Sequence, residues 1–382
     1  MKSRLFILLV LLVTIMSCRK EDVLVPSEQE QKGDAISSGY KGFYLLNEGN
    51  MGSNKATLDF YDFETATYTR NIFTQANPSM VHSLGDVGND LKVYGGRLYA
   101  VINCSNLVEV MDVATAKHIG TIECPNCRYL TFKDGYGYLT SYAGPVVVGT
   151  EHAQIGYVAK FDTATLQVVN TCHVGYQPDE LEVVGNKLYV ANSGGYMVPN
   201  YETTLSVIDL DSFDEIGRIE VAPNLYRVRK DRYGQLWVSS RGDYQYDAAS
   251  RTGHQPKLYC IDPAKGEVID SMEINVSNCC LDGDSIYIVG SSFNYNTMES
   301  EVTYGIVNVE THEVVTKAFI NDPSVDIQTP YGILVQPDTK DIYVADAKTY
   351  VTPGTLWCIG QDGKGKWSVR TGDIPAHMAV VY

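Results

Sequence analysis

A strand pattern that recurs along the whole chain is the feature that most constrains its fold. It is clearest in residues 178–221, which read PDELEVVGNKLYVANSGGYMVPNYETTLSVIDLDSFDEIGRIEV. Apolar and polar residues alternate in four short segments there: PDELEVV, KLYVAN, TLSVIDL and EIGRIEV. Turn residues, or a loop rich in Gly, Tyr and Asn, separate them. Alternation with a period of two predicts β-strands, and this turn chemistry predicts antiparallel pairing.

The second strand of this unit has seven copies along the chain, at a spacing of roughly 50 residues. The copies are Phe43-Tyr44-Leu45-Leu46, Leu98-Tyr99-Ala100-Val101, Tyr138-Leu139-Thr140, Leu188-Tyr189-Val190-Ala191, Leu236-Trp237-Val238-Ser239, Ile286-Tyr287-Ile288-Val289 and Ile342-Tyr343-Val344-Ala345. The third strand also recurs, and it usually ends in Asp before a turn: Asp62, Asp112, Asp162, Asp209 and Asp262. A repeat of this kind buries its faces only against its neighbours. The sequence therefore predicts an all-β fold, a seven-bladed β-propeller with four-stranded blades.

The two ends of the repeat array complement each other. The first copy begins directly at its second strand, Gly42-Phe43-Tyr44, and the chain finishes with a lone first strand, Ala376 to Tyr382. We expect this C-terminal strand to join the first blade and close the ring, because closure removes an exposed sheet edge.

The N-terminus has the features of a targeting segment. Lys2 and Arg4 precede an apolar run, Leu5 to Val13, that is too short to span a bilayer. The following Ile15-Met16-Ser17-Cys18 resembles a lipobox, and an ordinary secretory signal with an incidental Cys is the alternative. We expect residues 1–17 to be a lipoprotein signal peptide, Cys18 to be lipidated, residues 18–39 to form a flexible tether, and residues 40–382 to form the propeller.

The loops predict which face of the propeller carries function. Joins between first and second strands are tight turns, whereas joins between second and third strands are long and rich in Tyr, Asn, Gln and Ser. Such residues suit a large uncharged ligand with an apolar body and amide or hydroxyl groups, although Tyr-rich loops can also simply pack on one another. The candidate ligand-binding residues on this face are Tyr142, Tyr196, Tyr201, Arg241, Asp243, Tyr244, Tyr246, Asn294, Tyr295, Tyr331 and Tyr350.

Other chemistry is weakly supported by the sequence. Cys124 and Cys127 form a CxxC in a loop between blades, which favours a small disulfide in an extracytoplasmic protein, with free thiols as the alternative.

The seven His residues lack zinc-ligand spacing, so no metal site is expected. A net charge of −16 argues against nucleic acid as a partner. No Ser-His-Asp arrangement can be assigned, and we expect a protein that is not an enzyme.

A lactonase-like hydrolase is a third-ranked alternative. It would need acidic and amide side chains for calcium at the mouth of the channel. The acids available for such a site are Glu48, Asp179, Glu180, Asp243 and Asp346.

The repeat residues resemble a known family. Pro178, Asp179, Lys187-Leu188-Tyr189-Val190-Ala191-Asn192 and Leu205-Ser206-Val207-Ile208-Asp209 look like the YVTN-type repeat of YncE-like propellers. With the lipobox and the acidic Glu21 and Asp22 after it, the chain resembles the cobalamin-capturing surface lipoproteins of Bacteroidetes, the BtuG type.

That resemblance implies a location and a set of partners. The protein would be a surface-exposed outer-membrane lipoprotein, held to the membrane only by its lipid anchor. It would have no cofactor of its own, bind cobalamin (vitamin B12) and related corrinoids, and pass them to a TonB-dependent B12 transporter. The alternative is a recognition propeller for glycan or protein partners.

Overall fold

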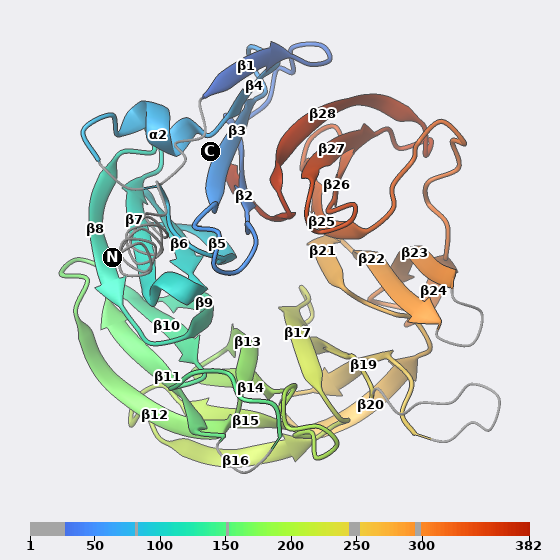
Figure 1. The fold of residues 1–382 in the computed structure, drawn as a ribbon. Coiled ribbons are helices and arrows are strands. Elements are labelled where there is room, and N and C mark those ends of the chain that lie inside the picture. The colour runs from blue at the N-terminus through green and yellow to red at the C-terminus, as the bar shows by residue number, and fades with distance from the viewer. Residues whose placement is uncertain (1–26, 81–82, 150–152, 244–252, 295–298) are drawn as a thin grey trace, which may run out of the picture.

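Seven antiparallel sheets surround a central axis, which confirms the predicted seven-bladed propeller (Figure 1). The structure is a computed structural model that describes residues 27–382 apart from 81–82, 150–152, 244–252 and 295–298. Cys18 and the expected signal peptide therefore lie outside the described residues. Within the described chain, no helix has the length and apolar character needed to cross a bilayer.

Blades two to four follow the repeat in chain order, with the first strand innermost. Blade two comprises β5 (Gly88–Tyr94), β6 (Arg97–Ile102), β7 (Leu107–Asp112) and β8 (His118–Glu123). Blade three comprises β9 (Cys127–Lys133), β10 (Tyr136–Ser141), β11 (Ile155–Asp162) and β12 (Val168–Tyr176). Blade four comprises β13 (Pro178–Val184), β14 (Lys187–Asn192), β15 (Thr204–Asp209) and β16 (Glu215–Glu220).

Blades five to seven repeat this order. Blade five comprises β17 (Leu225–Lys230), β18 (Leu236–Ser240), β19 (Lys257–Asp262) and β20 (Glu267–Met272). Blade six comprises β21 (Asn278–Asp282), β22 (Ser285–Asn294), β23 (Glu299–Asn308) and β24 (Glu313–Thr316). Blade seven comprises β25 (Pro330–Val335), β26 (Ile342–Asp346), β27 (Pro353–Ile359) and β28 (Gly365–Asp373). Short helices α2 (Ile72–Ala76) and η1 (Asn103–Ser105) lie in loops.

The first blade is closed as predicted, but it has one strand more than expected. β2 (Gly42–Asn47), β3 (Thr57–Asp62) and β4 (Thr67–Arg70) are completed by the C-terminal β29 (Pro375–Val381), which pairs with β2. On the other side, β1 (Glu28–Gln31) pairs with β4. Residues 28–31 were expected to be flexible tether, and the structure corrects this, because their backbone groups extend the sheet and cover its outer edge.

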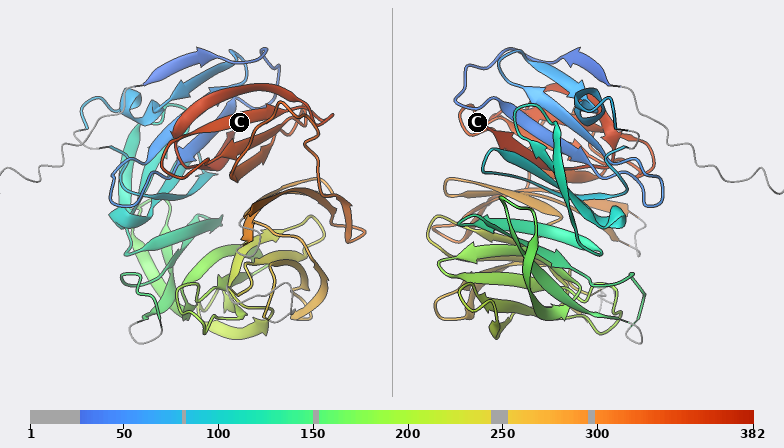
Figure 2. Two further views of the ribbon diagram at one scale, coloured as in Figure 1. Left: turned by 45° about the vertical axis from the view of Figure 1, so that its right-hand side comes forward. Right: turned by 90° about the vertical axis from the view of Figure 1, so that its left-hand side faces the viewer.

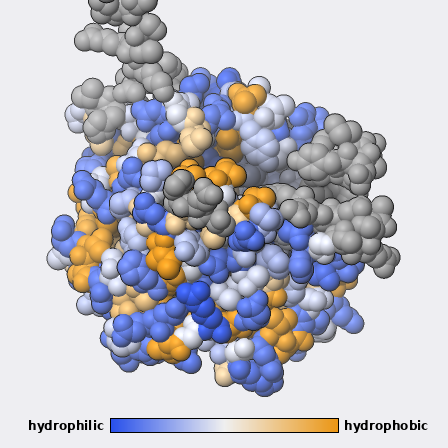
Figure 3. Space-filling model, turned by 60° about the horizontal axis from the view of Figure 1, so that its bottom comes forward, coloured by the Kyte–Doolittle hydropathy of each residue, from blue (hydrophilic) through white to orange (hydrophobic). Residues whose placement is uncertain are grey.

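Packing between blades explains the recurring sequence of the second strand. All residues of β2, β18 and β26 are buried, whereas the outer β16 is mostly exposed. Phe43 of β2 lies against Tyr343 of β26, with ring centroids 4.7 Å apart, so the first and last blades share one core. Figure 2 shows the packed blades from two further directions. Figure 3 shows separate hydrophobic patches among hydrophilic residues on one face.

The Asp residues that end the third strands hold the turns. The Oδ1 atom of Asp162 accepts hydrogen bonds from the backbone N–H groups of Ala164 and Thr165, at 2.9 and 2.8 Å. Four residues after each such Asp the chain takes a left-handed conformation, as at Leu166 and Gly266. An Asp side chain that mimics a turn is therefore the physical reason for the repeated Asp.

Removal of the closing strand is expected to unfold the ring. A chain that ends at Pro375 would expose the edge of β2 and one side of its blade, so we expect much lower soluble yield and melting temperature. A chain that lacks only Tyr382, which is 84% exposed, is the control and should melt like the full chain. Equal melting temperature and yield for all three chains would show that closure does not hold the ring together.

Candidate functional site

The first strands of all seven blades line the central channel, and they bring polar residues to one level. In each first strand, one residue pairs with the middle of the second strand, as Leu91 pairs with Ala100. We compare the residue that immediately precedes it in each blade. These residues are Asp90, Tyr129, Glu180, Arg227, Asn278, Gly332 and His377. Apart from Gly332 they are polar and buried. We call them the channel ring.

Glu180 is the most strongly paired member of the channel ring. One of its carboxylate oxygens lies 3.5 Å from Nη1 of Arg227, and the other pairs with Arg229 and accepts the N–H of Val228 at 2.8 Å. Burial alone would raise the pKa of Glu180, but the charges of Arg229, Arg227 and Lys92 outweigh it and lower the pKa from 4.5 to about 2. Glu180 is therefore an anion that holds two arginines in the channel.

Asp179 organises the mouth of the channel. The mouth lies on the face that carries the long loops between second and third strands, and we call this face the loop rim. Asp179 is 0% exposed. It accepts hydrogen bonds from the hydroxyl of Tyr142 at 2.6 Å and from Nη1 of Arg241 at 3.2 Å. Nε of Arg128 lies 3.7 Å away, and its guanidinium stacks on Tyr142 at 4.7 Å. Burial raises the pKa of Tyr142, so its hydroxyl stays protonated and can donate to Asp179.

Tyr331 and Tyr350 form a second aromatic group on this rim. Their rings meet edge to face at 5.8 Å, and Tyr350 is 41% exposed. The hydroxyl of Tyr331 donates to Glu48 at 3.2 Å, and the other oxygen of Glu48 lies 3.1 Å from Nε2 of His377. Because His377 belongs to β29, the closing strand contributes directly to this group.

Two tyrosines connect both groups across the mouth. The hydroxyls of Tyr129 and Tyr226 lie 3.0 Å apart. The Tyr226 ring lies 3.4 Å from the guanidinium carbon of Arg241, and the Tyr129 ring lies 6.4 Å from His377. The mouth is thus a continuous set of aromatic and charged side chains, held in place by ion pairs and cation–π contacts.

Two residues under the loop rim have buried polar atoms that make no hydrogen bond. Within the described chain, Nε of Arg128 and both side-chain polar atoms of Asn224 are buried and make no hydrogen bond. The loop of residues 192–203 covers Asn224, since a Cβ added to Gly195 would lie 3.3 Å from its Oδ1. Buried groups of this kind are uncommon and often mark a place where water or a ligand binds.

The structure brings together several of the residues proposed from sequence. Tyr142, Arg241, Tyr331 and Tyr350 belong to the mouth. Tyr196 and Tyr201 lie in the loop of residues 192–203, where Tyr196 is 40% exposed and its N–H donates to Gln177. Tyr142 is buried against Asp179, so its role is to position other groups rather than to offer a free ring.

The remaining candidates make other contacts or lie outside the described residues. Asp243 pairs with His254 at 3.1 Å. The backbone of Asn294 pairs with that of Glu299 at the end of β22. Tyr244, Tyr246 and Tyr295 lie outside the described residues.

Sequence reasoning missed most of the charged residues of the mouth and channel. Arg128, Tyr129, Tyr226, Arg227 and His377 were not proposed as ligand-binding residues, although Glu48, Asp179 and Glu180 were noted as acids. The available signal was a charged or polar residue at one position of several otherwise apolar first strands. In the structure these acids are paired with arginines or His377, and among the described residues no group of three or more His, Cys, Asp or Glu could hold a metal ion.

The predicted disulfide is not formed. Cys124 and Cys127 are both buried and carry free thiols. The thiol of Cys127 lies 3.4 Å from the carbonyl of Leu107, and that of Cys124 lies 3.7 Å from the Tyr157 hydroxyl. The CxxC interpretation failed because both side chains point into the packing between blades two and three.

The comparison with protein families assigns the chain. DUF5074, described as a domain of unknown function, matches residues 41–354, which is most of the propeller. The chain belongs to the DUF5074 family. Comparison of this DUF5074 propeller with curated proteins finds no match.

Several solved structures share the fold. A putative 6-phosphogluconolactonase from Bacteroides fragilis has a TM-score of 0.60 at 12% identity over 91% of this chain and 100% of its own. The Kuenenia stuttgartiensis hydrazine synthase has a TM-score of 0.58 at 16% identity over 72% of this chain and 77% of its own. A chain of a mitotic checkpoint complex has a TM-score of 0.56 at 9% identity over 95% of this chain and 90% of its own. At such identities these likenesses concern the propeller fold alone.

The substitution Glu180→Gln tests the buried ion pairs. It would leave Arg227 and Arg229 without their anion, so we expect the free energy of unfolding at pH 7 to fall by about 3–5 kcal/mol in urea denaturation. The exposed Glu220→Gln is the matched control and should change it little.

The same carboxyl predicts a pH dependence. Because the folded pKa of Glu180 lies below its ordinary value of 4.5, its stabilisation is present above pH 4.5 and is lost as the pH falls towards 2. In acid denaturation the native chain should therefore lose stability over this range more steeply than Glu180→Gln. Parallel curves would contradict the assigned charge.

Thiol labelling tests the cysteines. Cys124 and Cys127 are buried, so iodoacetamide should label them only after unfolding, whereas Cys104 is exposed and should react in the native protein. Peptide mass spectrometry without reduction reads this out. A peptide with Cys124 linked to Cys127 would restore the disulfide prediction.

Proposed function

We propose that this DUF5074 propeller captures cobalamin and related corrinoids at the mouth of its channel and is a binding protein rather than an enzyme. The observation that carries the proposal is the gathering, on the loop rim, of exposed aromatic rings above buried polar atoms that make no hydrogen bond. Tyr196 and Tyr350 are 40% and 41% exposed there, and Arg128 and Asn224 lie beneath. The opposite rim consists of tight turns such as Asp231–Gly234.

The chemistry of this rim suits a corrin. A corrin is a broad disc with a ring of amide side chains, so it needs flat apolar contacts and groups that both donate and accept hydrogen bonds. Tyr331 and Tyr350 offer ring edges and hydroxyl groups. An Asn side chain such as that of Asn224 matches a ligand amide with one donor and one acceptor, once the loop of residues 192–203 shifts away.

The network at the mouth would favour tight binding. Asp179, Arg241 and Tyr226 are already held by an ion pair and a cation–π contact, so a ligand orders few additional side chains. Preorganisation of this kind lowers the entropic cost of association.

The proposed setting is the cell surface, where the propeller would be anchored through Cys18 and would pass its ligand to a TonB-dependent B12 transporter. The exposed apolar residues of the rim loops support docking on a protein partner: Met51, Val146, Val147, Val148 and Val351. The same observation favours the second candidate function, a recognition propeller for a protein partner that does not bind corrinoids.

Titration with cyanocobalamin tests the proposal. We expect saturable binding at micromolar ligand or below by calorimetry, and binding weakened about tenfold by Tyr331→Ala or Tyr350→Ala, because each removes one aromatic contact. Tyr233→Ala is the matched control, since Tyr233 is 47% exposed on the opposite rim. No heat and no spectral shift with cyanocobalamin would leave the protein-recognition function as the better explanation.

A further inference from the structure

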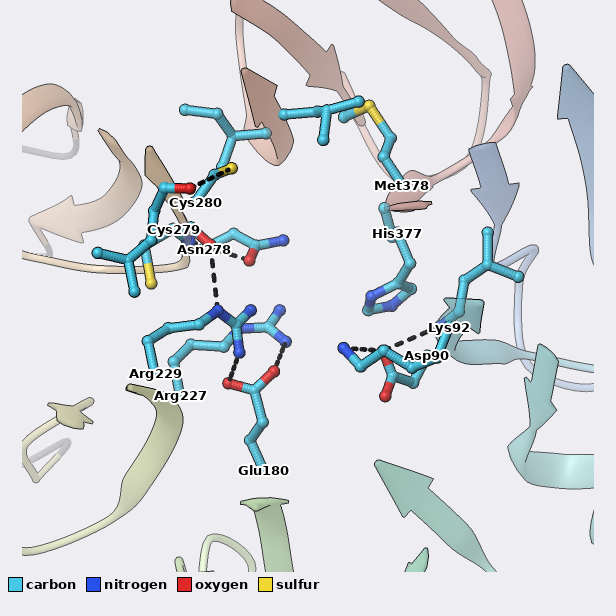
Figure 4. Close-up of a pocket in the computed structure, with 15 residues that line it drawn as sticks. Asp90, Lys92, Glu180, Arg227, Arg229, Asn278, Cys279, Cys280, His377 and Met378 are labelled. Atoms are coloured by element: carbon cyan, nitrogen blue, oxygen red, sulfur yellow. Dashed lines mark hydrogen bonds and ion pairs between the residues drawn. The ribbon is translucent and has the colours of Figure 1, made fainter. Parts of the chain in front are cut away.

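The channel below the mouth contains a cavity of about 200 Å³. It is lined by first strands from several blades, among them β5, β13, β17, β21 and β29. Figure 4 shows that the ammonium group of Lys92, the guanidinium groups of Arg227 and Arg229, the amide of Asn278 and the imidazole of His377 are directed towards the same open space. Hydrogen-bond donors from four strands, β5, β17, β21 and β29, thus converge on one small cavity.

The two carboxylates that line the cavity are already engaged. Asp90 accepts the N–H of Leu130 at 3.0 Å with one oxygen and contacts Lys92 at 3.2 Å with the other. Both oxygens of Glu180 are held by Arg227 and Arg229. Three cations therefore face two anions across the cavity lining.

Two further carboxyls, those of Glu48 and Glu182, adjoin this layer without lining the cavity, and Glu48 is engaged by His377 at 3.1 Å and by the hydroxyl of Tyr331. Burial raises the pKa of Glu182, and one of its oxygens accepts the N–H of Val183 at 2.9 Å. Both carboxyls lie outside the cavity lining, in which three cations face two carboxylates.

Donors remain available on the cationic side. Arg227 uses Nε for the carbonyl of Ser277 and Nη1 for Glu180, and Arg229 uses Nε for the carbonyl of Cys279. Within the described chain the Nη2 group of each arginine makes no hydrogen bond, and the ammonium of Lys92 has three donors but contacts only Asp90.

The sign of this cavity is opposite to that of the whole chain. The protein carries a net charge of −16, so anions in solution are repelled by most of its surface. A buried excess of positive charge in such a chain is costly unless a counter-charge accompanies it. An anion bound in the channel would satisfy both the excess charge and the free donors.

We propose that the channel cavity binds a small oxyanion, of the carboxylate or phosphate class, between Lys92, Arg227, Arg229 and Asn278. Guanidinium groups match planar carboxylate and tetrahedral phosphate oxygens in pairs, and the ammonium adds a point charge. The cavity is too small for a corrin, so this site is distinct from the proposed corrinoid site at the mouth and goes beyond that function.

Thermal denaturation of the full chain with inorganic phosphate, with succinate and with sodium chloride at equal ionic strength tests the site. We expect phosphate or succinate to raise the melting temperature saturably by about 2 °C or more, with chloride giving no saturable rise. Binding of both probes would indicate general oxyanion recognition, and binding of one would identify the class.

Variants separate this site from other effects. Lys92→Gln should weaken the apparent affinity for the probe about tenfold or more while cyanocobalamin binding is unchanged, and the exposed Lys187→Gln should behave as the native chain. If Lys92→Gln does not fold, Asn278→Asp places a negative charge in the cavity and should abolish binding. Equal shifts in chloride, or native affinity in Lys92→Gln, would overturn the proposal.

Discussion

The pairing of the C-terminal strand β29 with β2 is the constraint on which the rest of the molecule depends. It joins the two ends of a chain of blades, each of which buries its faces only against its neighbours. The same strand carries His377, which reaches Glu48 and thereby Tyr331 at the mouth. Ring closure and assembly of the candidate site are therefore one event, since an open ring would leave the channel without one wall.

Charges buried in the channel explain why the site is rigid. An ion pair away from water has a large desolvation cost, and it is tolerated when the partners also make good hydrogen bonds. Glu180 and Asp179 each bind more than one cation or hydrogen-bond donor, and the arginines in turn stack on Tyr142 and Tyr226. Such a network adds little to stability compared with a hydrophobic packing of the same volume, so its value lies in holding side chains in fixed positions around the channel.

Individual residues show how far the sequence could predict this structure. Tyr189 and Asp209 belong to patterns of strand and turn that recur with every blade, and such patterns report local backbone geometry. Cys124 and Cys127 misled because a CxxC spacing says nothing of where the side chains point. The strand Glu28–Gln31 was missed because its polar composition resembles a linker, and it is ordered by pairing with a distant partner, β4.

The sequence by itself determined the all-β class, the number of blades, the closure by the C-terminal strand and the face with long loops. These features follow from period, turn residues and the unequal ends of the repeat, all of which are local in the chain. Only the tertiary structure decided which side chains share the channel and its mouth. Residues such as Asp90, Glu180, Arg227 and His377 are separated by roughly 50 to nearly 300 positions, and they meet only because seven first strands converge on one axis.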